Sequence, residues 1–221
     1  MTAIQNLKKA FFPRGVAPRK VLSGILRGLQ FEIDPACQTQ IWFGLQEREL
    51  YPFFKKLSEG IETAVDVGAA DGFYTVFLLN RTGAKQVIAF EPQDSCLNKL
   101  KRNLALNPKP SSTQFVLNTS LVGNAEGQFP LDQLDISNGP CLIKIDTEGA
   151  EKDILSSAKK LLSRSNTRWI IETHSKQLEK DCIEILQSHS FKTQIIRPAW
   201  WRLFIPELRV MEHNRWLVAT C

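Results

Sequence analysis

The chain has 221 residues, of which 43% are hydrophobic and 23% are charged, with 12 glycines and 11 prolines. This balance is typical of a globular protein and excludes collagen-like and disordered chains. The net charge is +5, but the first thirty residues carry six basic side chains and no acid, so the rest of the chain is close to neutral. A dedicated nucleic-acid-binding domain would carry basic residues throughout, which argues against that class.

The cysteine pattern and the hydropathy point to a cytoplasmic protein. The five cysteines lie far apart without a C-x-x-C pair, which argues against a zinc site and a disulfide framework and fits a reducing compartment. They are Cys37, Cys96, Cys141, Cys182 and Cys221. No apolar stretch approaches the roughly 18 residues of a transmembrane span, and the first twenty residues lack a secretory signal. We interpret the basic N-terminus as a solvated arm, with a targeting presequence or an amphipathic anchor in weak contact with a membrane surface as the alternatives.

The predicted elements begin with an N-terminal elaboration over residues 1–60. Alternation around two glycines predicts a small hairpin over Val21–Ile33, and apolar spacing predicts a helix near Leu45–Leu57. We expect the basic arm, this hairpin and this helix to pack on a core domain that spans residues 61–221.

Beyond residue 60, short β-branched runs alternate with helical patterns, which is typical of an α/β fold with crossover helices. Strands are predicted at Thr63–Val67, Gln86–Phe90, Gln114–Asn118, Cys141–Ile145, Trp169–Glu172, Lys192–Ile196 and Trp216–Thr220. Helices are predicted at Tyr74–Asn80, Asp94–Leu106, Gly149–Leu162 and Gln177–Ser188. The expected architecture is a seven-stranded, mostly parallel, doubly wound Rossmann-like sheet.

In such a sheet, ligands bind at the carboxyl ends of the strands, where the winding reverses. After the first core strand, Gly68 and Gly72 allow a tight turn and close approach of the backbone to a ligand. At the end of the second strand, the carboxylate of Glu91 is placed to accept hydrogen bonds from the two hydroxyls of a ribose. These features indicate a ligand that contains adenosine.

A nicotinamide dinucleotide is the competing ligand at this corner of the sheet. Its G-x-G-x-x-G pattern would require glycines where Ala70 and Phe73 stand. The acid Asp66 at the strand end would repel a pyrophosphate, whereas it can receive a cationic amino group. A ligand with a nucleoside at one end and an amino acid at the other satisfies both acids, and S-adenosylmethionine is such a ligand.

The candidate catalytic residues follow the fourth and fifth core strands. Alternation places Lys144 and Asp146 on the same side of their strand, and Glu172 and His174 are likewise two residues apart. A histidine with an ordinary pKa near 6.5 can take a proton from a hydroxyl nucleophile near neutral pH. Glu151, in contrast, is interpreted as an acid stabilised by the dipole of the helix that it begins.

A divalent cation is the alternative at the same place, because two carboxylates and an imidazole suit such a metal. Its ligands would be Asp146, Glu172 and His174. The sequence contains no contiguous metal-binding motif, so a metal is not favoured and no ligand set is assigned.

Four segments resemble the FkbM-type family of S-adenosylmethionine-dependent methyltransferases. They are DVGAADGFYT at 66–75, AFEP at 89–92, LIKIDTEGAEKDIL at 142–155 and IIETHS at 170–175, and the KIDTEGAE block is the most specific. The resemblance covers the chain from about Leu22 to the C-terminus. It implies a class I methyltransferase fold and a reaction that usually methylates a hydroxyl, often of a sugar or another small metabolite.

Carried over position by position, the resemblance assigns the cofactor site. Asp66, Gly68 and Gly72 become contacts to the methionine end and Glu91 the contact to the ribose. The remaining predicted cofactor contacts are Ala69, Asp71, Tyr74, Pro92, Asn118, Ser120 and Asp146, with Asn118 and Ser120 expected near the adenine.

The expected function is therefore O-methylation of a small hydroxylated acceptor, glycosidic or anionic, by in-line transfer with help from a base. One alternative is a binding or scaffolding module of the same fold without turnover. Nucleic-acid methylation is disfavoured because the turn after the fourth strand reads Asp146-Thr-Glu-Gly rather than Asp/Asn-Pro-Pro-aromatic. A cluster of aromatic and basic residues near the C-terminus is interpreted as a dimer surface or a corner of the core rather than as an acceptor site. It comprises Arg197, Trp200, Trp201, Arg202 and Phe204. No sequence pattern indicates the oligomeric state.

Overall fold

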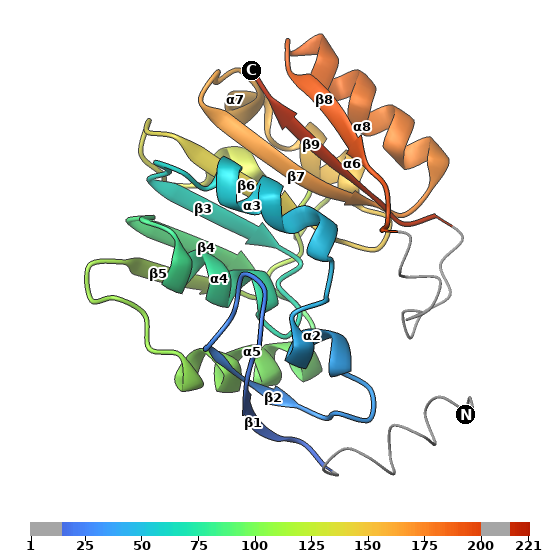
Figure 1. Ribbon diagram of the computed structural model, residues 1–221. Coiled ribbons are helices and arrows are strands. Elements are labelled where there is room, and N and C mark those ends of the chain that lie inside the picture. The colour runs from blue at the N-terminus through green and yellow to red at the C-terminus, as the bar shows by residue number, and fades with distance from the viewer. Residues whose placement is uncertain (1–14, 200–212) are drawn as a thin grey trace.

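A seven-stranded sheet forms the centre of the protein in the computed structural model, which describes residues 15–199 and 213–221 (Figure 1). Its strand order is β5-β4-β3-β6-β7-β9-β8. The strands are β3 (Thr63–Val67), β4 (Gln86–Phe90), β5 (Gln114–Asn118), β6 (Cys141–Ile145), β7 (Thr167–Thr173), β8 (Lys192–Ile196) and β9 (Arg215–Thr220). Strands β3 to β7 are parallel, and β9 runs antiparallel to both β7 and β8. The predicted mostly parallel, doubly wound sheet is confirmed.

The chain reverses its winding between β3 and β6. From β3 it proceeds through β4 to β5 on one side, and from β6 it proceeds through β7 on the other. Every residue of β3 and β6 is buried, because helices cover both faces of the sheet there. The carboxyl ends of these two central strands therefore mark the expected ligand site.

Helices form a layer on each face of the sheet. One face packs against α3 (Tyr51–Leu57), α4 (Phe73–Arg81) and α5 (Asp94–Leu106). The other packs against α6 (Glu151–Ser156), α7 (Lys159–Leu162) and α8 (Lys176–Ser188). Alternation along the strands supplies both cores, since Ala64 points to the first face and Val65 to the second.

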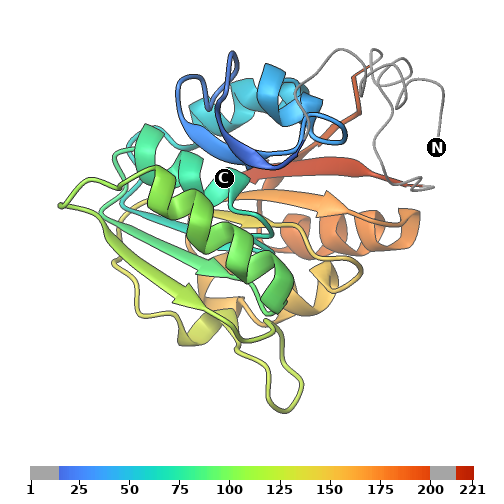
Figure 2. The same ribbon diagram turned by 90° about the horizontal axis from the view of Figure 1, so that it is seen from below.

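The N-terminal hairpin is present, but its first strand begins earlier than predicted. β1 (Ala17–Lys20) pairs antiparallel with β2 (Gln30–Ile33), and residues 21–29 form the connection between them. The hairpin lies beside α5 (Figure 2). Asn107, which caps the C-terminus of α5, accepts a hydrogen bond from the Gln30 N–H and donates one to the Gln30 carbonyl, and Asn103 of α5 accepts one from the Glu32 N–H. These amide side chains attach the hairpin to the core domain.

The helix expected over Leu45–Leu57 is wrong in its first half. Gly44 and Glu47 have positive φ values of 66° and 46°, which end the short helix α2 (Thr39–Phe43) and interrupt any continuation. A single 3-10 turn, η1 (Arg48–Leu50), then leads into α3.

The helix expected over Gly149–Leu162 is also wrong, because two short helices with a break at Ser157 replace it. The Ser157 hydroxyl donates to the Ile154 carbonyl and accepts from the Leu131 N–H, while its own carbonyl accepts from the Asp132 N–H. Serine diverts backbone groups from the helix in this way, and it docks the 3-10 turn η2 (Leu131–Gln133) on the break.

The hairpin and α3 share one apolar cluster with the sheet, so this part of residues 1–60 packs directly on the core. The proposed domain boundary at residue 60 stays a prediction. Two predicted features lie outside the described residues: the basic side chains of the arm before residue 15, and the aromatic group at Trp200, Trp201, Arg202 and Phe204. Among the described helices, none is long and apolar enough to cross a membrane.

Candidate active site

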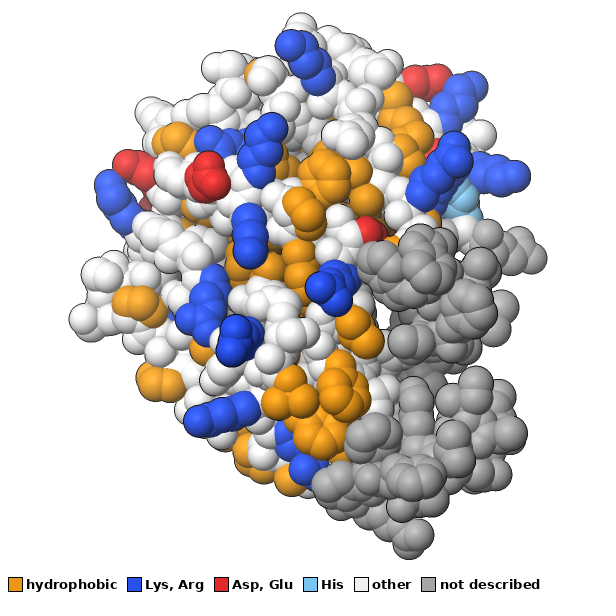
Figure 3. Space-filling view, in the orientation of Figure 1, with side chains coloured by type: hydrophobic (Ala, Val, Ile, Leu, Met, Phe, Trp, Pro, Cys, Tyr) orange, Lys and Arg blue, Asp and Glu red, His pale blue; other side chains and the backbone are white. Residues whose placement is uncertain are grey.

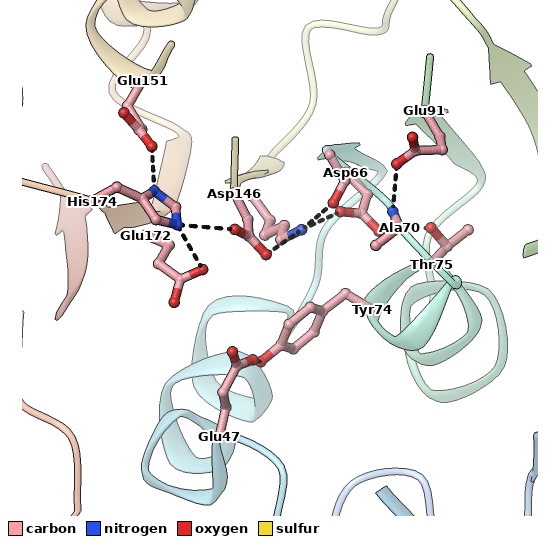
Figure 4. Close-up of polar contacts among 12 residues, drawn as sticks. Glu47, Asp66, Ala70, Tyr74, Thr75, Glu91, Asp146, Glu151, Glu172 and His174 are labelled. Atoms are coloured by element: carbon pink, nitrogen blue, oxygen red, sulfur yellow. Dashed lines mark hydrogen bonds and ion pairs between the residues drawn. The ribbon is translucent and has the colours of Figure 1, made fainter. Parts of the chain in front are cut away.

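The carboxyl ends of four neighbouring strands bring the predicted site residues together (Figure 4). Asp66 lies near the end of β3, Glu91 directly follows β4, and Asp146 directly follows β6. Glu172 lies near the end of β7, and His174 directly follows that strand. Residues that are more than one hundred positions apart in the chain thus meet at one edge of the sheet.

The turn after β3 requires glycine at its first position. Gly68 has φ +76°, and a Cβ there would lie 1.9 Å from the carbonyl oxygen of Asp146. The turn and the loop after β6 therefore approach each other as closely as backbones can. Gly72, with φ +90°, precedes α4, and Ala69 is buried beneath the turn. The Asp71 carbonyl accepts a hydrogen bond from α5, and burial raises the pKa of its carboxyl group.

The carboxylate of Glu91 supports the same turn from the end of β4. Its Oε2 accepts a hydrogen bond from the Ala70 N–H at 2.7 Å, and its Oε1 accepts one from the Gln93 N–H at 2.8 Å. Each carboxylate oxygen has a second lone pair, so these bonds fix the orientation of Glu91 and leave acceptor capacity for a ligand. Pro92 follows it in an exposed position.

The position predicted to meet the adenine lies next along the edge. The Asn118 carbonyl at the end of β5 accepts a hydrogen bond from the Glu91 N–H at 3.0 Å. The Asn118 side chain accepts from the Ser120 N–H at 2.8 Å, and both residues are half-buried. The predicted ribose and adenine contacts are therefore neighbours, as one nucleoside would require; the contacts themselves stay predictions.

Asp66 is occupied by protein groups rather than open to solvent. The Thr75 hydroxyl donates to its Oδ2 at 2.6 Å, and the Lys144 ammonium lies 3.0 Å from its Oδ1. Asp66 is completely buried and Lys144 is 2% exposed. The predicted contact between Asp66 and an amino group stays a prediction, and this structure shows the carboxylate balanced by a lysine.

Lys144 joins the ends of β3 and β6 and the start of α4 at the centre of the site. Its Nζ donates to the Gly68 carbonyl at 2.7 Å, lies 3.4 Å from Asp146 Oδ2 and sits 5.4 Å from the centroid of the Tyr74 ring. Burial lowers the pKa of Lys144, but Asp66 and Asp146 raise it more, so the amine stays protonated. The predicted orientation of Lys144 and Asp146 toward one side of their strand agrees with this contact.

Asp146, Glu172 and His174 form a second group beside Lys144. His174 Nε2 lies 3.6 Å from Glu172 Oε2 and 3.9 Å from Asp146 Oδ1. Burial and the adjacent charge of Asp146 raise the pKa of Glu172 well above its ordinary value. Burial also raises the pKa of Asp146, but Lys144 and a hydrogen bond with Glu172 lower it more. At neutral pH, Glu172 therefore holds the proton and Asp146 carries the charge.

The other nitrogen of His174 contacts Glu151, which the helix-dipole interpretation missed. Nδ1 lies 2.5 Å from Glu151 Oε1, and Glu151 is completely buried at the start of α6. Burial lowers the pKa of His174, but Glu151 raises it more. The carboxylate fixes the ring, so Nε2 faces the cluster (Figure 4). An acid at the start of a helix gives no sequence signal for a partner that follows another strand, so the contact with His174 could not be predicted.

Sequence reasoning also missed Glu47, which reaches the site from the N-terminal elaboration. The Tyr74 hydroxyl donates a hydrogen bond to the Glu47 carboxylate, and both residues are buried. Burial and this carboxylate raise the pKa of Tyr74, whose ring stacks on Phe54 with centroids 4.3 Å apart. Glu47 lies in a polar stretch that resembles a solvated face, so no local pattern indicated it.

The geometry of the three side chains is compatible with the alternative of a bound divalent cation. Ligand atoms of Asp146, Glu172 and His174 lie within 4.8 Å of one another. The Lys144 ammonium offsets part of the carboxylate charge at this place, because it lies beside both Asp66 and Asp146. The described geometry is compatible with general base chemistry and with a bound cation, so the preference for general base chemistry stays a prediction.

Known proteins share both sequence and fold with this chain. The family described as Methyltransferase FkbM domain matches residues 66–134 and 127–197, together more than half of the chain. A comparison with curated proteins gives no sequence match.

Solved methyltransferases share the fold. A methyltransferase FkbM from Methylobacillus flagellatus KT aligns with TM-score 0.58 and 17% identity over 73% of this chain and 44% of that chain, so this chain spans less than half of its length. A precorrin-6y C5,15-methyltransferase from Geobacter metallireducens GS-15 gives 0.52 and 15%, covering 78% and 86%. A putative methyltransferase from Streptococcus mutans, in complex with SAH, gives 0.51 and 16%, covering 78% and 97%. These likenesses establish a class I methyltransferase fold, and with the family match over more than half of its length, the chain belongs to the FkbM methyltransferase domain family.

Proposed function

We propose that the protein is an S-adenosylmethionine-dependent methyltransferase that methylates a hydroxyl group of a sugar or another small metabolite. One observation carries the proposal. The glycine turn at Gly68, the Glu91 carboxylate and the His174 ring held by Glu151 all lie at the carboxyl ends of neighbouring strands. Family membership supports methyl transfer, and the SAH in the Streptococcus mutans protein supports the choice of cofactor.

The residues present fit this cofactor. Because Gly68 has no side chain, the turn after β3 can approach the loop after β6. Two backbone N–H groups hold the Glu91 carboxylate in an orientation suited to the two hydroxyls of a ribose. Asp146 has the most accessible carboxylate beside Lys144, with its side chain 29% exposed. We therefore assign the amino end of the cofactor to Asp146 in place of Asp66, to which the sequence pattern assigns it, and assign to Asp66 and Lys144 the role of holding the turn behind Asp146.

When bound, S-adenosylmethionine supplies a methyl group that is already activated on a sulfonium. The protein then has to hold the acceptor oxygen in line and remove one proton. The new oxygen–carbon bond forms as the carbon–sulfur bond breaks, and the bonding electrons leave with sulfur. The proton of the acceptor hydroxyl moves to His174 Nε2, while Glu151 stabilises the imidazolium through Nδ1.

The cofactor assignment is tested by calorimetric titration of the full chain with S-adenosylmethionine and SAH. We expect micromolar binding that Glu91→Ala weakens, because the ribose hydroxyls lose their acceptor. Glu184→Ala is the matched control, since this exposed carboxylate lies on α8 and pairs only with Lys180 at 3.7 Å among the described residues. Absence of binding to folded protein would overturn the proposal.

Transfer is then measured with radiolabelled S-adenosylmethionine and a panel of hydroxylated sugars and small alcohols. SAH binding without transfer to any acceptor would favour the binding-module alternative. The Asp146-Thr-Glu-Gly turn argues against methylation of nucleic acids. Methyl transfer to RNA or DNA would therefore contradict the proposal of a small-molecule acceptor.

A further inference from the structure

A pocket of about 550 Å³ lies at the opposite edge of the sheet from the candidate active site. Two of its lining residues, Gly60 and Gly83, precede β3 and β4, which places the pocket at the amino ends of these strands. The hairpin connection and the ends of α3 and α4 form its walls. Its volume lies in the range of small-molecule sites, about 300 to 1,000 Å³.

Three positive charges surround this hollow. Arg27 comes from the hairpin connection, Lys55 from α3 and Arg81 from α4, and Glu59 is the single acid among the lining residues. Arg81 Nη2 donates to the Arg27 carbonyl at 2.7 Å, which joins two of the walls. Within the described ranges, no ion pair involves any of the three cations. Figure 3 shows Lys and Arg side chains gathered over this side of the molecule.

The rest of the lining suits a molecule with both an anionic and a less polar part. Ile25 and Phe77 are buried and form an apolar floor. Gly60 and Gly83 present bare backbone, and in the described chain neither N–H donates to a backbone carbonyl. Both glycines are exposed, and exposed backbone N–H groups beside cations can donate hydrogen bonds to an anion.

Helix dipoles explain only part of this arrangement. Lys55 and Arg81 lie in the last turns of α3 and α4, where positive charge is favourable on its own. Arg27 belongs to no helix, yet the chain places it over the same hollow. A ligand explains all three cations together.

We propose that this pocket binds an organic phosphate. Arginine guanidinium groups pair well with phosphate oxygens, and the apolar floor accommodates the organic part of the molecule. The same chemistry occurs in a free phosphorylated metabolite and in the headgroup of an anionic phospholipid.

Two measurements on the full chain separate these sources. Calorimetry uses sn-glycerol 3-phosphate, with inorganic phosphate for comparison, and sedimentation uses vesicles of phosphatidylcholine with or without phosphatidylglycerol. We expect one site whose affinity falls with added salt and drops roughly tenfold in Arg27→Gln and Lys55→Gln. Lys101→Gln, an exposed change on α5 outside the pocket, serves as the control.

Each outcome decides the proposal. Binding of glycerol 3-phosphate identifies a free metabolite, whereas binding to phosphatidylglycerol vesicles alone identifies a headgroup, provided that Arg27→Gln weakens it and Lys101→Gln does not. No binding of either kind, or an equal loss of affinity in Arg27→Gln and in the control Lys101→Gln, overturns the proposal. Arg27 is exposed, so thermal unfolding of its variant should match the wild type. No cofactor is added, so the result is independent of the proposed methyl transfer.

Discussion

Glu151 determines how His174 can act. The carboxylate holds Nδ1 and raises the pKa of the ring, so the base that removes the acceptor proton is neutral only above that pKa. Activity should therefore fall as the pH drops through the raised pKa of His174. Glu151 does not touch the reacting atoms and acts as a positioning residue.

Replacing Glu151 by Gln tests this role through the pH profile. The amide still accepts a hydrogen bond but carries no charge, so the pKa of His174 should fall and the acid limb of kcat should move to lower pH. His174→Ala should lower kcat by about a hundredfold to ten-thousandfold. The profile of Glu184→Gln should match the wild type. An unchanged acid limb in Glu151→Gln would contradict the assignment.

Glu172 distinguishes proton chemistry from metal chemistry. Because its carboxyl group is already protonated, Glu172→Gln keeps the charge and the hydrogen-bond donor, and kcat/KM should stay within a few fold. Asp146→Asn removes the ionised carboxylate that lies beside Lys144 and Glu172, and it should abolish most of the activity. A chelator should have no effect on the wild type. Loss of activity in Glu172→Gln together with sensitivity to the chelator would instead support a bound cation.

Gly68 offers a test of backbone approach. Gly68→Ala should destabilise the protein by more than the roughly 1–2 kcal/mol of a strained φ, because its Cβ also meets the Asp146 carbonyl. Gly127→Ala is the matched control, since Gly127 has φ +79° and nothing within 4 Å of an added Cβ. Urea unfolding and SAH titration measure both effects. Equal destabilisation by the two substitutions would show that the close approach has no role.

Among the elements, buried parallel strands could be predicted from the sequence and the short irregular helices could not. β3, β4 and β6 match their predicted bounds because continuous apolar runs mark strands buried on both faces. The edge strands β5 and β8 also match their predicted bounds, although most of their residues are exposed or half-buried. The Ser157 break and the left-handed residues at 44 and 47 depend on partners elsewhere in the fold, such as Leu131.

The site, like the elements, could be predicted only where it depends on the strands. The ends of the strands could be placed from the pattern of apolar residues, and this placed Asp146, Glu172 and His174 together at the ends of neighbouring strands. The contact between Glu151 and His174 and the one between Glu47 and Tyr74 could not, because each joins elements whose relative position only packing decides.

The attachment of the hairpin is an element-scale prediction. Asn107→Ala removes two hydrogen bonds to Gln30 and should cost about 1–3 kcal/mol in stability. Amide hydrogen exchange should rise across β1 and β2 more than in the sheet. Asn98→Ala, exposed on the same helix, should change neither measurement. Uniform exchange changes across the protein would contradict a local attachment.

For the whole molecule, the sheet separates two proposed sites at its opposite edges. The carboxyl edge gathers buried carboxylates around one lysine, and the amino edge gathers exposed cations around a pocket. Substitutions in one site should therefore leave ligand binding in the other unchanged, because no charged residue is shared between them.

Stability should depend on pH through Glu172, whose pKa is higher in the folded state than in the unfolded chain. Above its ordinary pKa of 4.5, the unfolded chain releases a proton that the folded protein keeps. Its contribution is therefore lost progressively as pH rises, by at most about 1.4 kcal/mol per pH unit. The raised pKa of His174 acts in the same direction above about pH 6.5, so the wild type alone cannot isolate Glu172. Comparison with Glu172→Gln cancels the contribution of His174. Measured by urea unfolding at each pH, the free energy of unfolding of the variant should rise relative to that of the wild type between pH 5 and 8. A difference in the free energy of unfolding that stays constant with pH would show that Glu172 ionises normally in the folded protein.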